Sequence, residues 1–211
     1  MKTSTMLKVL TGAAVMLLPL TASAESNFQT GAGALTSTAH VDFQVTIPKI
    51  LYLRVGQGSA YPTTLATVAG VDLVTFSPAA GVVGNGTAVA GAGGDLTGGV
   101  STAAIISNSG NVTLNATATG ALSDGVAGDS IAYTQITTAA TALTGTYTLL
   151  PAPVLSNATS ANVVLTAPLT KVITADAKWT FAFANTTTPP AGTYGGVAVN
   201  NGRVTYTATM P

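Results

Sequence analysis

Residues 178–211 read KWTFAFANTTTPPAGTYGGVAVNNGRVTYTATMP, and this stretch carries the clearest structural signals in the chain. Trp179, Phe181 and Phe183 alternate with small or polar residues. In an extended strand successive side chains point to opposite faces, so all three rings lie on one face. The alternation therefore predicts a strand that packs its aromatic face into a hydrophobic core.

A second strand is expected at the end of the same stretch. Residues 200–202 are Asn-Asn-Gly, and an Asn-Gly step tolerates the positive φ angles that a tight hairpin turn requires. They separate 193–199 from 203–210, where Val204 and Tyr206 begin a new alternation. We predict a hairpin of these two segments, with Val204 and Tyr206 in the core.

Tyr194 lies where the chain enters this final segment, in the sequence Pro-Pro-Ala-Gly-Thr-Tyr. A tyrosine at a strand entry is typical of the tyrosine corner of Ig-like sandwiches, in which the phenol bonds back to nearby backbone. Tyr194 is our candidate for that role. The alternative is that it is one more aromatic residue packed on a strand.

Residues 1–24 have the pattern of a signal peptide. Lys2 and Lys8 precede an apolar run at 9–20, and Ala-Ser-Ala at 22–24 is a typical cleavage site. The run is shorter than the ~20 residues that span a bilayer core, so we expect no transmembrane anchor in the mature chain. We expect export through the periplasm to the cell surface, a fimbrium or the extracellular space.

Composition narrows the possibilities for the 187 residues that follow Ala24. Removing Lys2 and Lys8 from the seven basic residues leaves five against seven acidic ones, a net charge near −2. Nucleic-acid binding needs clustered Lys and Arg, so we expect no nucleic-acid partner. The chain has no Cys, and residues typical of exposed helix faces are scarce, which favours an all-β protein.

Strict alternation runs from 35 to 47, after a flexible lead at 25–34. One face carries Leu35, Ser37, Ala39, Val41, Phe43, Val45 and Ile47. Pro48 cannot donate a ladder hydrogen bond, so it should interrupt this strand before a second one at 50–55.

The rest of the chain reads as short strands joined by turns, apart from a Gly/Ala-rich loop at 79–100. Expected strands are 71–76, 103–107, 111–118, 131–136, 146–149, 162–166 and 172–175. The total is about ten strands, and their spacing predicts one antiparallel Ig-like β-sandwich over 35–211.

Three segments resemble a known group of proteins: FQVTIPKILYLRVG (43–56), SNSGNVTLNATATGALSDG (107–125) and PAGTYGGVAVNNGRVTYTATMP (190–211). They resemble exported bacterial surface β-sandwich proteins, which are themselves similar to pilin-like fimbrial subunits of the archaic chaperone–usher type. Fimbrial subunits commonly carry a Cys pair, which this chain lacks.

The resemblance implies an incomplete Ig-like sandwich that is completed by the N-terminal strand of the next subunit. The donor would be residues 35–47, with Leu35, Ala39, Val41, Phe43, Val45 and Ile47 as the assembly strand, or residues 27–34. It also implies self-association into a homopolymer, with a periplasmic chaperone and an usher as further partners. The alternative is that 35–47 is simply the first strand of its own sheet.

Catalytic and metal chemistry have few candidates. His40 is the only histidine and lies on the polar face of 35–47, and no Gly-x-Ser-x-Gly sequence occurs. Without Cys, one His cannot make a zinc site. Asp124 and Asp129 have oxygens suited to calcium, but Asp in such a segment is favoured for turns. We expect no enzymatic activity, no metal and no cofactor.

Two functions are compatible with these expectations. The first is a structural or adhesive subunit of a bacterial cell-surface fibre or extracellular matrix, of the kind found in pili and biofilms. The second is a secreted carbohydrate- or protein-binding module that acts as a monomer. Aromatic rings outside the expected core, which such a module would use, are chiefly Tyr52 and Tyr61.

Overall fold

The computed structural model describes residues 25–57 and 65–211. The chain divides into two units, one ending at Ile47 and one spanning Pro48–Pro211. The predicted signal peptide at 1–24 and the candidate ring Tyr61 lie outside the described residues.

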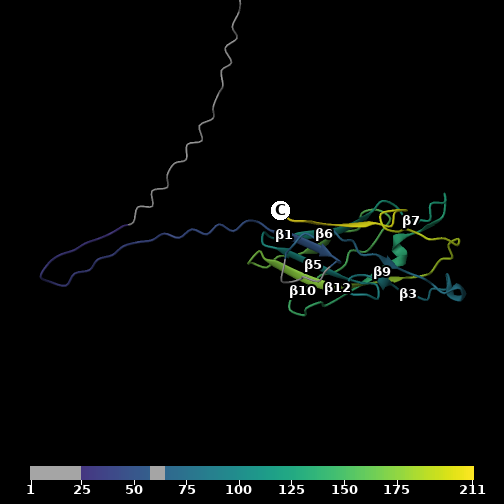
Figure 1. Cartoon of the computed structure of the whole chain (residues 1–211), viewed down its shortest axis with the longest axis horizontal. Helices are drawn as coiled ribbons and strands as arrows, with labels where there is room; N and C mark the ends of the chain where they lie inside the picture. Colours follow the sequence, from purple (N-terminus) through teal and green to yellow (C-terminus); the bar gives the residue numbers. More distant parts are fainter. Residues whose placement is uncertain (1–24, 58–64) are drawn as a thin grey trace, which may run out of the picture. The chain divides into compact units, whose positions relative to one another are not determined.

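Residues 25–47, which we call the arm, form no strand. Figure 1 shows them in purple as an extended trace that turns back on itself. The Ser37 hydroxyl donates to the carbonyl of Asn27, and His40 Nδ1 lies 2.8 Å from a carboxylate oxygen of Glu25. The strand expected at 35–47 is therefore absent from the sheets of this chain, because no other strand pairs with its backbone.

The unit 48–211 is built from β-strands, with two short 3-10 helices in its described residues. Its larger sheet is centred on two antiparallel neighbours, β5 (Val100–Ser107) and β12 (Ile173–Phe183). β1 (Leu51–Val55) pairs with β5 and forms one edge. The remaining strands of this sheet all pair with β12: β9 (Ile136–Thr141), β3 (Val89–Ala90) and, in parallel, β10 (Thr148–Leu149).

A second sheet has three strands in the order β11–β6–β13. Its middle strand is β6 (Val112–Ala118), and its edges are β11 (Val163–Leu165) and β13 (Val204–Thr209). Two further pairs are short: β2 (Val74–Thr75) with β4 (Ala92–Gly93), and β7 (Leu122–Ser123) with β8 (Ser130–Ile131). The 3-10 helices are η1 (Ala80–Val82) and η2 (Tyr133–Gln135). The all-β class is confirmed.

The main hydrophobic core joins side chains of both sheets. Trp179 of β12 is completely buried, and its ring lies 5.3 Å from that of Tyr206 on β13. The indole Nε1 donates to the carbonyl of Leu150 at 3.0 Å, which satisfies its only polar atom. Val112 and Leu114 of β6 belong to the same buried cluster.

The hairpin expected between 193–199 and 203–210 is not formed. Asn200 and Asn201 have the positive φ angles of a tight turn, but 193–199 is not a strand, and β13 pairs with β6 instead. Gly195 and Gly196 also have positive φ angles, which breaks extended backbone just before the turn. Similarly, η2 separates β8 from β9 where one strand was expected at 131–136.

Candidate binding groove

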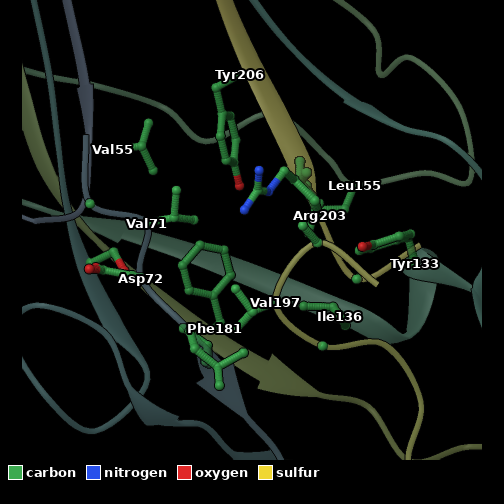
Figure 2. Close-up of a pocket in the computed structure, with 18 of the residues that line it drawn as sticks. Val55, Val71, Asp72, Tyr133, Ile136, Leu155, Phe181, Val197, Arg203 and Tyr206 are labelled. Atoms are coloured by element: carbon green, nitrogen blue, oxygen red, sulfur yellow. The ribbon is translucent and has the colours of Figure 1, made fainter. Parts of the chain in front are cut away.

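A groove of about 360 Å³ opens between the end of β1 and the start of β13. Its walls are mostly apolar, and Figure 2 shows Val71, Phe181 and Tyr206 directed toward the same space. The lining side chains come from strands of both sheets and from the loops beside them: Leu53, Val55, Val71, Asp72, Val74, Phe76, Tyr133, Ile136, Leu155, Phe181, Val197, Arg203, Val204 and Tyr206.

Both strands beside the groove are sheet edges. Among the described residues, β13 pairs only with β6 and β1 only with β5. Each therefore has a second row of backbone N–H and C=O groups with no strand beside it, which is a template for a further strand. The groove lies beside the first half of β13, because Val204 and Tyr206 line it and the later residues of the strand do not.

The two strands meet at the end away from this opening. The Lys49 ammonium donates to the carbonyl of Pro211 at 3.1 Å, which joins the residues just before β1 and after β13. The Ser107 hydroxyl lies 3.4 Å from the sulfur of Met210. The groove is thus open near Arg203 and closed near Pro211.

Two charged residues, Asp72 and Arg203, line the groove, and they differ in the number of polar contacts that they make. One oxygen of Asp72 accepts from the backbone N–H and the side-chain amide of Gln57, at 3.2 and 2.9 Å. Its other oxygen accepts from the Asp95 N–H at 2.8 Å and the Ser101 hydroxyl at 2.9 Å. Asp72 is therefore fully used in holding the adjoining loops together. Arg203 is exposed and forms no ion pair with a described residue.

Two phenols contribute to the groove. The Tyr133 hydroxyl donates to the carbonyl of Asn201 at 2.6 Å, which fixes the turn before β13. Burial raises the pKa of Tyr133 to about 12. Burial raises the pKa of Tyr206 as well, and the nearby Tyr133 adds to the shift. Both phenols are consequently neutral in the folded protein at ordinary pH.

The residues of the expected assembly strand all lie on the arm and are exposed. Phe43 is 91% exposed, and Leu35, Ala39, Val41, Val45 and Ile47 are exposed with it. Apolar side chains with this degree of exposure are unusual on a monomeric protein. The chain therefore contains both an exposed segment of alternating apolar residues and an apolar groove beside an edge strand.

The other expected site residues lie in the unit 48–211. Phe181 and Phe183 are buried with Trp179, whereas Val204 and Tyr206 are half-buried. The Tyr194 hydroxyl donates to the carbonyl of Pro190 at 2.8 Å, four residues earlier in the chain. Its role as a tyrosine corner between sheets remains a prediction.

Asp124 and Asp129 both occur in a turn. A carboxylate oxygen of Asp124 accepts from the Val126 N–H at 2.9 Å, and the Asp129 N–H donates to the carbonyl of Val126. Within residues 25–57 and 65–211, no three His, Cys, Asp or Glu side chains are grouped so as to hold a metal ion. In the same ranges no helix has the length and apolar character needed to cross a membrane.

Comparison with known proteins gives no match: no protein-family model, curated protein or solved structure is similar to this chain. The groove was not predicted from the sequence, because its lining residues are spread from Leu53 to Tyr206. The one signal available was the alternation of β13, which marks an apolar face without indicating whether a neighbouring strand covers it.

Proposed function

We propose that this protein is a non-enzymatic structural subunit of a bacterial cell-surface fibre or extracellular matrix. In this proposal, residues 35–47 of one copy insert as an added strand beside β13 of the next copy. The observation that carries the proposal is that one chain contains both an exposed alternating arm and an apolar groove beside an unpaired strand edge.

The chemistry of the arm matches that of the groove. An added strand gains main-chain hydrogen bonds from the open edge, and its alternate side chains fill the groove. Val41, Phe43, Val45 and Ile47 are exposed on the arm, and burying each of them fully contributes ~1.5–3 kcal/mol.

The direction of the groove supports assembly into open fibres. The unit 48–211 begins at the closed end of the groove, beside Pro211, whereas the opening lies near Arg203. An arm that enters at the opening therefore belongs most simply to a second copy. A contact between different surfaces of two copies is head-to-tail, and repetition gives a filament when it does not close into a ring.

The proposal includes a finer description of the fold. We infer that the two main sheets form a pilin-like, Ig-like sandwich that lacks one strand beside β13. The shared core around Trp179 and the edge positions of β1 and β13 support this interpretation. An exported subunit of this kind would need a periplasmic chaperone and an usher to cover the groove before assembly.

The test uses the mature chain, residues 25–211, with Val41→Ser and Phe43→Ser introduced together in the arm. Wild-type protein should form filaments visible by electron microscopy, and the variant should remain monomeric by size-exclusion chromatography. A synthetic peptide of residues 34–47 should bind the variant and raise its melting temperature. The matched control is a peptide with the same two substitutions, which should have no effect.

Wild-type protein that stays monomeric at every concentration, together with no effect of the wild-type peptide, would contradict strand donation. Filaments formed equally by the arm variant would show that assembly uses another surface.

The groove also supports a second candidate function, a binding module for a small carbohydrate or peptide. Its volume lies in the range of ligand pockets, and its phenols and Arg203 are polar groups within an apolar wall. Under this alternative a glycan array should give a specific ligand. That ligand should bind the monomer and lose affinity when Tyr206 is changed to Phe.

A further inference from the structure

Arg203 lies at the opening of the groove and has no ion-pair partner among the described residues. It directly precedes β13 and is exposed like Thr205, Thr207 and Thr209, on the face of the strand opposite to Val204 and Tyr206. Figure 2 shows its guanidinium at the rim of the groove, beside the Tyr206 phenol. The only other charged side chain of the lining, Asp72, already accepts four hydrogen bonds, from Gln57, Asp95 and Ser101. The cation of Arg203 at the opening is therefore the groove charge that no neighbouring side chain of the described residues engages.

The alternating part of the arm carries one anion. Asp42 lies between Val41 and Phe43 but on the opposite face, with the polar residues. It is exposed, and it is the only acidic residue in 35–47. The nearby His40 is already paired with Glu25.

The apolar pattern of the arm alone does not fix one register in the groove. A slip of one residue would turn the apolar face outward, so it is strongly disfavoured. A slip of two residues keeps the same face inward and replaces each apolar side chain by its neighbour in the series. Some additional contact must distinguish these registers.

We infer that Asp42 of one copy forms an ion pair with Arg203 of the next copy and thereby fixes the register of the added strand. This inference rests on the proposed strand donation. The end of the arm at Ile47 is tethered to its own unit, so it must stay at the opening of the groove. The arm therefore runs antiparallel to β13, which starts at that opening.

The pairing of Asp42 with Arg203 determines every other pair, because residues directly opposite each other in an antiparallel ladder share a face. Val41 then lies opposite Val204, and Ala39 lies opposite the large ring of Tyr206. A two-residue slip in either direction would place Asp42 opposite Asn201 or Thr205, where it meets no cation.

The register can be measured by disulfide cross-linking, because the chain has no native cysteine. Thr38→Cys is combined in turn with Thr205→Cys, Thr207→Cys or Thr209→Cys in the mature chain. Residues two apart on a strand have equivalent hydrogen-bonding positions, so the three pairs are geometrically matched. We expect cross-linked multimers chiefly from the pair of Thr38→Cys with Thr207→Cys.

Charge variants then test whether the ion pair between Asp42 and Arg203 is the cause of this register. Asp42→Arg alone and Arg203→Asp alone should abolish the preference for position 207, and combining the two should restore it. Lys171→Asp makes the same change in charge at an exposed turn outside the groove, and it should leave the preference intact. High salt should weaken the preference, because it screens an exposed ion pair.

The outcomes separate this inference from the proposed function. Multimers that cross-link equally well at positions 205 or 209, or that keep their preference in Asp42→Arg, would overturn the ion pair while leaving strand donation intact. Cross-links confined to monomers would overturn the intermolecular pairing in favour of insertion into the same chain. The absence of any cross-link, with no filaments, would overturn both proposals.

Discussion

The phenols of Tyr133 and Tyr206 are the titratable groups that folding perturbs most clearly. Burial favours the neutral form, so the pKa of Tyr133 rises from 10.0 to about 12 and the pKa of Tyr206 is raised as well. A group with a raised pKa in the folded state contributes its full stability below the pKa of the unfolded chain. That contribution is lost as the pH rises through the folded pKa.

We therefore predict that the free energy of unfolding is constant up to about pH 10 and then falls toward pH 12. For Tyr133 alone the loss is on the order of 2 kcal/mol. Urea unfolding at a series of pH values measures it, and phenolate absorbance should show that Tyr133 and Tyr206 titrate late. Tyr133→Phe should make the decline shallower, whereas an unchanged slope in that variant would contradict the assignment.

Asn185 shows how one side chain can order a long loop at the scale of elements. It is completely buried just after β12, with a φ of 54°. Its amide oxygen accepts from the Gly84 N–H at 2.8 Å, and its amide nitrogen donates to Val82 and Thr87 carbonyls at 2.7 and 3.2 Å. Residues 82–87 of the Gly/Ala-rich segment are therefore held to the end of β12 by hydrogen bonds to Asn185.

Asn185→Ala should destabilise the protein by ~1–3 kcal/mol, because it leaves buried backbone groups without partners. Hydrogen exchange should increase first in residues 79–88, and urea unfolding gives the total loss. Asn185→Gly is the matched control, since glycine accepts the positive φ angle without strain. Equal losses in the two variants would assign the effect to the hydrogen bonds, and no loss in either would exclude this role.

Local signals in the sequence predicted some elements well and others poorly. The alternation around Trp179 predicted a buried strand, and the Asn-Asn-Gly sequence at 200–202 predicted a turn with positive φ angles, both of which occur. The partner of β13 was not predictable in this way. It is β6, which is distant in sequence, and pairing over such a distance depends on the packing of the whole core.

At the scale of the molecule, the all-β class could be predicted because it depends on composition and alternation. The groove could not, because it depends on which strand edges remain unpaired after the sheets assemble. The arm is the clearest example. Its alternation is as regular as that of a core strand, yet residues 35–47 have no strand beside them in this chain.

The exposed arm should be the first target of a protease that cuts after aromatic residues. Phe28 and Phe43 are 87% and 91% exposed, whereas the phenylalanines of β12 are buried. We predict that chymotrypsin cleaves the monomer after both arm residues. In the proposed filaments the cut after Phe43 should disappear, because strand donation would bury that residue in the groove of the next copy.

Phe28 lies outside the inserted segment and serves as an internal control for the same digest. Mass spectrometry of the fragments distinguishes the two sites. Cleavage after Phe43 that is equally fast in monomers and filaments would count against its insertion.

The pairing of β6 with β13 has a consequence for a chain that is threaded across a membrane from its N-terminus. In such a chain β6 would emerge before β13, which follows only after the segment between Ala118 and Val204. Until then, the apolar face of β6 has no completed sheet around it. Under the proposed export, the chain would cross the membrane with β6 still unpaired, and premature association with a neighbour would compete with folding.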